Sequence, residues 1–328
     1  MSKLATTGVL AQLKQATVMT LSATGDGTGV STLRFGVSSQ ITVTLNANAH
    51  FYTEPTGMDG ESQTWTVTSG ALRTIYLKCT SGTATLTITD ASKINYFGDS
   101  SGQGNGWLSS TNAAQLTFDV SKLINLSNLR IEGNSVISGA LPNGLTFLHL
   151  NGNSINWTYS GALPTGLTIL YLYGNLINWT YSGALPTGLI YLQLNGNSIN
   201  WTYSGALPTG LTYLYLIGNS INWTYSGALP TGLTILQLNG NSINWTYNAI
   251  EGTANFTYFE LNNYRSSKMS SDDMVTLLDS IRMRDGRCCS SITINDYEDY
   301  TDPPQKVKDA KLALIAADKG VTTINLGE

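Results

Sequence analysis

Aromatic and amide side chains recur at three positions of a repeated sequence, and these residue types suit the recognition of neutral ligands. Aromatic rings cover the apolar faces of sugars or of partner side chains, while Gln and Asn amides donate and accept hydrogen bonds. The candidate binding residues are Phe147, His149, Tyr171, Tyr173, Tyr191, Gln193, Tyr213, Tyr215, Gln237 and Tyr258. We expect a sugar or a partner protein as the ligand. A plain strand surface is the alternative, because β-propensity alone favours Tyr and Ile.

The candidate residues belong to a repeat of constant length, and this repeat determines where each side chain falls. It begins with Leu-Pro at Leu141, Leu163, Leu185, Leu207 and Leu229, so each step is 22 residues. Inside each copy runs the frame L-x-x-L-x-L-x-x-N-x-I. Alternate residues of a strand point to opposite faces, so the L-x-L leucines predict a buried face. The candidate residues flank these leucines and are therefore expected on the outward, concave face of a stacked parallel sheet.

Other columns of the repeat predict structural roles. We expect the frame asparagine to turn inward and to hydrogen-bond backbone groups that the turn leaves unpaired. The columns beginning at Trp157 and Tyr159 are expected to form two ladders of identical rings on the far side of the coils. No Asp, Glu, Lys or Arg occurs between Gly133 and Ile250. This composition avoids like charges on strands that lie about 4.8 Å apart.

The repeat closely resembles the leucine-rich repeat family, and its LP-x-GL start resembles the shorter bacterial class. This resemblance implies a solenoid whose strands line one sheet. Imperfect copies at 126–134 and 256–261 extend the array. Helical patterns over 271–285 and 303–319, each followed by an I-x-I or I-x-L strand, predict a helical C-terminal cap that covers the last coil.

The first third of the chain has a different pattern. Alternating apolar and polar residues, separated by Gly, Ser and Asn, predict an antiparallel β-sandwich. The predicted fold class is thus an N-terminal all-β sandwich followed by a C-terminal leucine-rich-repeat solenoid with two helices in its cap. The predicted boundaries are a tail or short helix at 1–16, the sandwich and candidate anchor domain at 17–97, a Gly/Ser linker at 98–106, and the solenoid at 107–328, with perfect repeats at 141–247 and the cap at 265–328.

Composition and motifs favour binding over catalysis. The chain has two histidines, and it has no nucleophile elbow, phosphate loop or zinc-spaced cluster, so we expect no enzyme and no cofactor. The acidic residues Asp296, Glu298, Asp299 and Asp302 are interpreted as a solvated turn and helix cap rather than a calcium loop. With a net charge of −4 and no basic stripe, nucleic acid is not an expected partner. No apolar run reaches the length of a membrane span, and the N-terminus does not have the pattern of a signal peptide.

A second resemblance concerns the chain as a whole. Its sandwich region, the DVSKLINLSNL segment and the low-charge repeat resemble repeat proteins of phages that infect gut Bacteroidetes, including crAss-like phages. The phage proteins that the chain resembles are similar to components of fibres or of the head decoration. The resemblance implies a virion surface protein that assembles with other virion structural proteins, forms a homo-oligomer with a trimer favoured, and contacts host surface polysaccharide. The alternative is a secreted or surface adhesin of bacteria.

Overall fold

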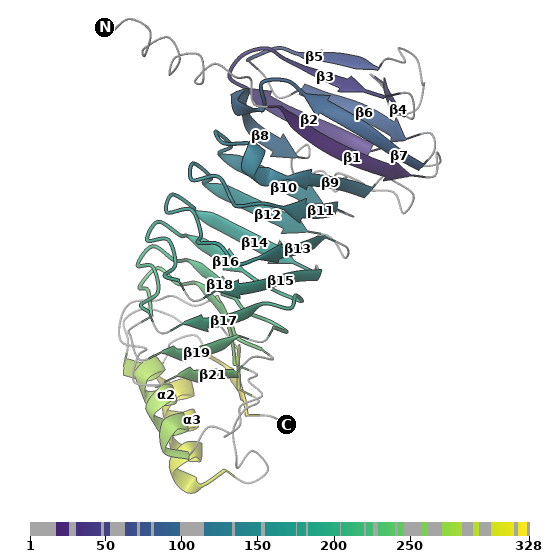
Figure 1. Ribbon diagram of the computed structural model, residues 1–328. Coiled ribbons are helices and arrows are strands. Elements are labelled where there is room, and N and C mark those ends of the chain that lie inside the picture. Colours follow the sequence, from purple (N-terminus) through teal and green to yellow (C-terminus); the bar gives the residue numbers. More distant parts are fainter. Residues whose placement is uncertain are drawn as a thin grey trace, which may run out of the picture. The chain divides into compact units, whose positions relative to one another are not determined.

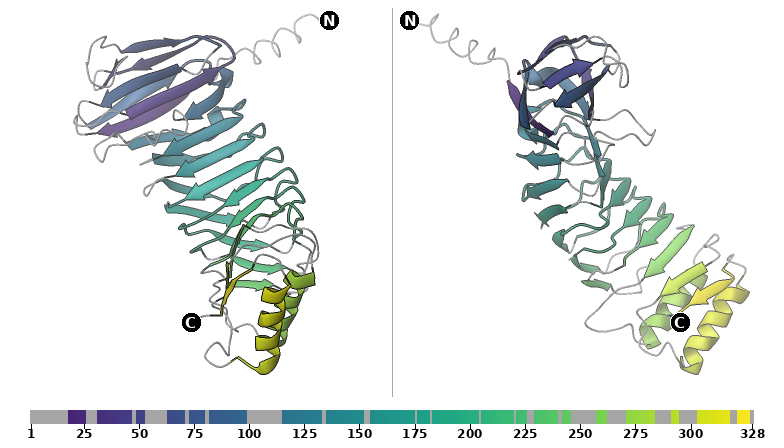
Figure 2. Two further views of the ribbon diagram at one scale, coloured as in Figure 1. Left: turned by 180° about the vertical axis from the view of Figure 1, so that it is seen from behind. Right: turned by 90° about the vertical axis from the view of Figure 1, so that its right-hand side faces the viewer.

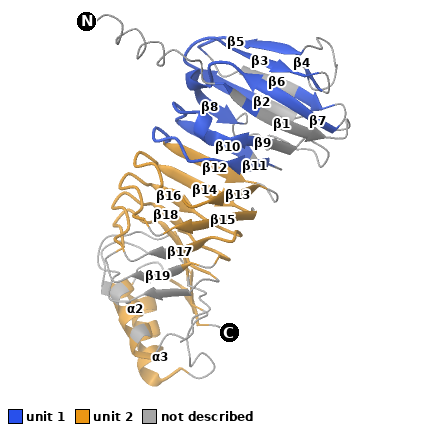
Figure 3. Ribbon diagram, in the orientation of Figure 1, with its two compact units in different colours: residues 1–145 blue, residues 146–328 orange. Residues whose placement is uncertain are grey.

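The computed structural model gives two compact units, residues 1–145 and 146–328 (Figure 3). The residues it describes are 18–25, 31–46, 49–52, 63–70, 73–79, 82–98, 115–132, 135–151, 155–174, 176–181, 183–203, 205–219, 221–225, 229–239, 242–245, 257–261, 271–283, 291–294, 303–317 and 321–326. The predicted tail at 1–16 and almost all of the predicted linker lie outside the described residues.

The first unit begins with antiparallel strands. They are β1 Met19–Gly25, β2 Ser31–Val37, β3 Ile41–Leu45, β4 Ala49–Tyr52, β5 Thr64–Val67, β6 Arg73–Cys79, β7 Gly82–Ile88 and β8 Ile94–Gly98. They lie in the orders β1-β7-β3-β5 and β8-β2-β6-β4. Phe35 of β2 and Trp65 of β5 join the two groups, with ring centroids 5.6 Å apart. The antiparallel strands agree with the sequence pattern, while the complete β-sandwich remains a prediction.

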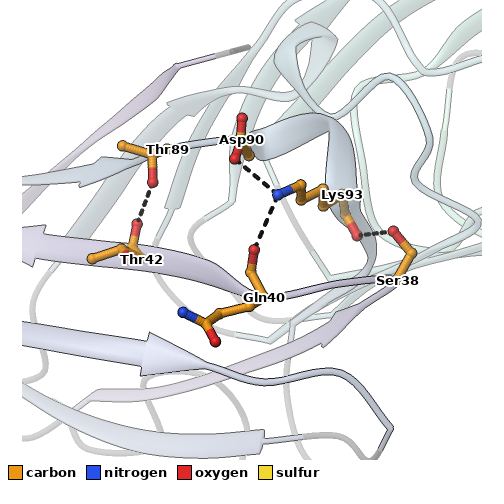
Figure 4. Close-up of polar contacts among 6 residues, drawn as sticks. All are labelled: Ser38, Gln40, Thr42, Thr89, Asp90 and Lys93. Carbon is orange, nitrogen blue, oxygen red and sulfur yellow. Dashed lines mark hydrogen bonds and ion pairs between the residues drawn. The ribbon is translucent and has the colours of Figure 1, made fainter.

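A short 3-10 helix, η1 Ala91–Lys93, connects β7 to β8 and is held by polar contacts (Figure 4). Lys93 Nζ donates to Asp90 Oδ2 at 2.9 Å and to the carbonyl of Gln40 at 3.2 Å. The Lys93 carbonyl accepts the hydroxyl of Ser38 at 3.2 Å. At the start of the same connection, the hydroxyl of Thr89 donates to the carbonyl of Thr42 in β3. These bonds fix the turn from which β8 enters the parallel part of the chain.

Parallel coils follow, and they make residues 117–260 a parallel β-solenoid. In the first unit, β9 Gln115–Asp119 pairs with β11 Ser135–Ser138, and β10 Asn128–Glu132 pairs with β8, both in parallel. Leu129 and Ile131 are buried, as expected for an imperfect copy of the repeat. Phe118 of β9 is buried as well.

In the second unit each perfect coil supplies one strand to each of two parallel sheets (Figures 1 and 2). The tyrosine sheet contains β12 Phe147–Asn151, β14 Ile169–Tyr173, β16 Tyr191–Gln193, β18 Tyr213–Tyr215, β20 Ile235–Gln237, β22 Tyr258–Leu261, β23 Ser291–Ile294 and β24 Thr323–Asn325. The tryptophan sheet contains β13 Asn156–Tyr159, β15 Leu176–Tyr181, β17 Asn200–Tyr203, β19 Asn222–Tyr225 and β21 Ser242–Trp245. The frame leucines of the tyrosine sheet, such as Leu148 and Leu170, are fully buried.

The frame asparagines that the structure describes turn inward, which confirms the prediction. Asn197 Nδ2 donates to the carbonyls of Leu172 and Asn195, both at 3.0 Å, and its Oδ1 accepts the backbone N–H of Ile177 at 3.4 Å. Asn219 makes the equivalent three bonds one coil later. Each of these amides therefore ties its own coil to the preceding one.

The tryptophan and tyrosine columns do not form ladders of identical rings, and that prediction was wrong. In the tryptophan sheet the coils pair with an offset of twenty residues, so Tyr159 lies beside Trp179 and Tyr181 beside Trp201. The rings form one alternating series inside the coil, with centroids 4.6 Å apart for Trp157–Tyr159, 6.2 Å for Tyr159–Trp179 and 4.8 Å for Trp179–Tyr181. All of these rings are buried, whereas the Asn and Thr between them are exposed.

The tyrosines of this series also explain the constant Ser-Gly-Ala after each of them. The hydroxyl of Tyr159 donates to the carbonyl of Ala162 at 2.7 Å, and Tyr181 makes the same bond at 2.6 Å. The ring covers the intervening glycine so closely that a Cβ at Gly161 would lie 2.6 Å from the hydroxyl oxygen. The turn therefore requires glycine for space.

Two helices precede the last strands and confirm the predicted helical pattern of the C-terminal part. They are α2 Ser271–Met283 and α3 Gln305–Ala316, which lie side by side (Figure 2). The apolar stripe of each is buried, namely Met274, Leu277 and Ile281 of α2 and Val307, Ala310 and Leu314 of α3. Helix α3 begins two residues later than predicted, with Pro304 as its N-cap.

A threonine row lies beside the tyrosine sheet, and one coil interrupts it. Hydroxyls of this row donate to the carbonyl of the equivalent residue one coil earlier, at 3.0 Å for Thr168 to Thr146, Thr212 to Ile190 and Thr234 to Thr212. Ile190 takes the place of threonine in its coil and leaves 47% of its surface exposed. The row is therefore one hydroxyl short at this position.

Replacing Ile190 with Thr is expected to stabilise the protein by about 0.5–1 kcal/mol, because the new hydroxyl can donate to the Thr168 carbonyl and an exposed apolar side chain is removed. Urea unfolding of the two proteins measures the difference. The reverse change at an intact position, Thr212→Ile, should have the opposite sign. A stability of Ile190→Thr below that of the parent chain would contradict this account of the row.

Candidate functional site

The predicted binding residues lie on the outward face of the tyrosine sheet, which we call the tyrosine face. In β12 and β14, residues 148, 150, 170 and 172 are buried, and the residues between them are partly or well exposed. Strand pairing aligns equivalent positions of successive coils, which gives two rows across the face. One row is Phe147, Ile169, Tyr191, Tyr213, Ile235 and Tyr258, and the other is His149, Tyr171, Gln193, Tyr215, Gln237 and Glu260.

Four tyrosines form a cluster in the middle of this face. The ring centroid of Tyr191 lies 5.9 Å from that of Tyr171, 5.0 Å from Tyr213 and 6.3 Å from Tyr215. The interplanar angles are about 30°, so the rings partly cover one another's faces. The four rings therefore pack against one another as one cluster and are not four separate flat platforms. Tyr213 at its rim keeps 36% of its surface exposed.

A hydrogen bond inside the cluster orients its amide. The hydroxyl of Tyr191 donates to Gln193 Oε1 at 2.7 Å. Gln193 is only 8% exposed, because its tyrosine neighbours pack around it. The bond fixes which end of the amide is the acceptor for Tyr191. The Gln193 NH₂ group is therefore oriented as a hydrogen-bond donor of this face.

The cluster carries no charge at physiological pH. Burial raises the pKa of Tyr191 to about 12, and the phenolate charges of Tyr215, Tyr171 and Tyr213 add to the effect. Burial likewise raises the pKa of Tyr215. Both hydroxyls remain protonated far above neutral pH and act as hydrogen-bond donors and acceptors.

The raised pKa of Tyr191 predicts a loss of stability in alkali. Between pH of about 10 and 12 the unfolded chain loses the Tyr191 proton while the folded chain keeps it, so the free energy of unfolding falls as pH rises through this window. We expect Tyr191 to contribute about 1 kcal/mol to this fall, because solvent screens a half-buried ring. Urea unfolding across the window measures it. The Tyr191→Phe variant should show a shallower fall, and equal slopes would contradict the assignment.

The remaining aromatic residues extend the cluster toward β12. His149 lies 4.3 Å from Tyr171 between ring centroids, and Phe147 lies 6.2 Å from His149. Tyr173 is 6.4 Å from Tyr171 and is 46% exposed. The structure thus joins eight of the ten predicted residues into one continuous patch, from Phe147 to Tyr215.

The last two predicted residues, Gln237 and Tyr258, meet at a residue that the sequence analysis missed. Gln237 Nε2 donates to Glu260 Oε2 at 2.7 Å, and the hydroxyl of Tyr258 donates to the same oxygen at 2.6 Å. The signal was present in the imperfect copy Phe256-x-x-Phe259-x-Leu261, in which Glu260 takes the position of Gln237. The aromatic face therefore borders a carboxylate.

The described residues contain no group of three or more His, Cys, Asp or Glu side chains placed to hold a metal ion. Nor do they include a helix with the length and apolar content that crossing a membrane would require. What the tyrosine face offers chemically is aromatic surface with hydroxyl and amide groups, which is suited to binding.

The chain gives no match to protein-family models or to curated proteins. Its class is instead defined by its own geometry. It is a repeat protein with a parallel β-solenoid of about 22-residue coils, and this architecture is compatible with a leucine-rich repeat.

Proposed function

We propose that this protein is a non-enzymatic binding protein and that its tyrosine face binds host-surface glycan. The observation that carries the proposal is the packed cluster of Tyr171, Tyr191, Tyr213 and Tyr215 with Gln193. Tyrosine supplies large contact area with little conformational freedom to lose, and its hydroxyl matches the hydroxyl groups of sugars. A neighbouring protein subunit would find the same properties favourable, and this is the second candidate ligand.

The rest of the predicted organisation belongs to the same proposal. The solenoid is a leucine-rich repeat of the short bacterial type, supported by the repeat frame and the inward asparagines. The antiparallel strands of the first unit form a β-sandwich that anchors the protein. The resemblance to fibre and head-decoration proteins supports placement on a virion surface, in a homo-oligomer with other virion proteins. An adhesin at a bacterial surface or outside the cell is the alternative.

Binding of the labelled full-length chain to candidate host cells, with and without their capsule, tests the proposed ligand. We expect capsule-dependent binding that falls more than tenfold when Tyr171, Tyr191, Tyr213 and Tyr215 are all changed to Ala, because central aromatic residues dominate binding energy. The matched control changes exposed residues of the tryptophan sheet, Asn156, Asn178 and Asn200, to Ala and should bind normally.

Three outcomes separate the alternatives. Capsule-independent binding would remove the glycan from the proposal. Equal losses in both variants would mean that the tyrosine face is not the site. Proteomics of purified particles tests the virion assignment separately, and absence of the chain from them would leave the adhesin.

A further inference from the structure

Among the residues that the structure describes on the tyrosine face, Glu260 is the one with a carboxylate or a basic side chain of the Lys or Arg type. Among the outward residues of the described strands β12 to β24, all others are aromatic, aliphatic, amide, hydroxyl or imidazole side chains. Its position in the row of Tyr215 and Gln237 places it where the next unit of an extended ligand would lie. A polymer that follows the rows therefore meets uncharged coils and then a carboxylate.

The Glu260 carboxylate is fixed in position by its neighbours. Tyr258 and Gln237 both donate to Oε2, at 2.6 and 2.7 Å. Hydrogen bonds to an ionised acceptor are stronger than neutral ones and hold the side chain in one geometry. Tyr258 is 46% exposed, so a ligand that contacts its ring comes close to this charge.

A fixed carboxylate discriminates between ligands by their charge. An anionic group placed about 4 Å away is repelled even at the dielectric constant of water, and more strongly where a bound ligand excludes water. A neutral sugar meets no such repulsion, and the ammonium of an amino sugar is attracted. The sequence from Gly133 to Phe259 contains no Lys or Arg, so the coils before Glu260 supply neither of these cations to compensate an acidic ligand.

We propose that Glu260 determines the specificity of the tyrosine face, by excluding acidic polysaccharides in favour of neutral and amino-bearing ones. This inference rests on the proposed function and names its ligand class. Glu260 acts as a charge filter next to the subsite formed by Tyr258 and Gln237, while the tyrosine cluster supplies contact area common to all ligands.

A glycan array with neutral, amino-bearing and uronic-acid members tests the inference, using the full-length chain and its Glu260→Gln variant. Gln keeps an acceptor for Tyr258 but removes the charge. We expect the parent chain to bind acidic members at least about tenfold more weakly than neutral members of the same length. For the variant, the ratio of its affinity for neutral members to its affinity for acidic members should be less than about threefold. Added salt should lower this affinity ratio in the parent chain but not in the variant.

The control is Asp309→Asn on helix α3, which changes the net charge equally and lies off the tyrosine face. It should leave the ratio unchanged, and thermal unfolding should confirm that both variants are folded. If the parent chain and Glu260→Gln disfavoured acidic glycans equally, the role of Glu260 would be overturned, while glycan binding itself would stand. Absence of binding to every member by both proteins would instead overturn the proposed function, and this inference with it.

Discussion

Replacing Asn197 with Ala is expected to lower the free energy of unfolding by about 3 kcal/mol. The side chain satisfies three backbone groups, the carbonyls of Leu172 and Asn195 and the N–H of Ile177. Each net hydrogen bond contributes about 1 kcal/mol, and a buried group left unpaired costs at least as much. Alanine can replace none of the three bonds.

The matched control is Asn200→Ala, one residue beyond the end of the same frame but exposed on the outer side of the tryptophan sheet. It should change stability by less than about 0.5 kcal/mol. Urea unfolding followed by circular dichroism measures both variants. Hydrogen exchange adds a spatial test, because each coil contacts mainly its neighbours and the loss should concentrate around β14 to β16. Similar losses of unfolding free energy for the two variants would contradict the stabilising role of the inward-turned Asn197.

Much of the solenoid could be predicted because its determinants are local. The L-x-L spacing fixes which face of a strand is buried, and Leu148 and Leu170 are buried accordingly. The frame asparagine is predictable because a tight turn leaves backbone groups that only an amide with both donor and acceptor can satisfy. The helices of the C-terminal part follow from their apolar stripes and reach within three residues of their predicted bounds.

The register of the tryptophan sheet could not be predicted from the period. A repeat of 22 residues shows which residues are equivalent in successive coils. It does not show which residues of neighbouring strands pair, because the pairing register also depends on the tilt of the strands. In the tyrosine sheet equivalent residues do pair, as Leu170 does with Leu192. In the tryptophan sheet Tyr159 pairs with Trp179 instead. The hydroxyl of Tyr159 reaches the Ala162 carbonyl over a glycine, a contact that no spacing rule contains.

The candidate site was predicted in its position but not in its internal structure. Outward orientation follows from the strand period, so all ten predicted residues fall on one face. The packing of Tyr191 against its neighbours and its bond to Gln193 depend on side-chain geometry across three coils. Glu260 was missed because its coil departs from the perfect repeat, and equivalence there becomes clear only once strand pairing is known.

The alternating rings of the tryptophan sheet predict the second large effect, at Trp179. Its ring lies between Tyr159 and Tyr181, with centroids 6.2 and 4.8 Å away, and only 3% of the residue is exposed. Trp179→Ala should cost about 4 kcal/mol, because neither neighbour can fill the cavity while its hydroxyl holds a turn carbonyl.

Trp179→Phe separates ring packing from polar effects. The buried indole N–H of Trp179 finds no acceptor among the described residues, so removing it relieves a cost that partly offsets the smaller ring. We therefore expect Phe to cost about 1–2 kcal/mol, clearly less than Ala. Thr180→Ala, on the exposed side of the same strand, should be near neutral. Urea unfolding should rank the three variants in stability as Thr180→Ala, then Trp179→Phe, then Trp179→Ala. A Phe variant as unstable as the Ala variant would show that the indole N–H is satisfied and that more than packing holds the series of rings.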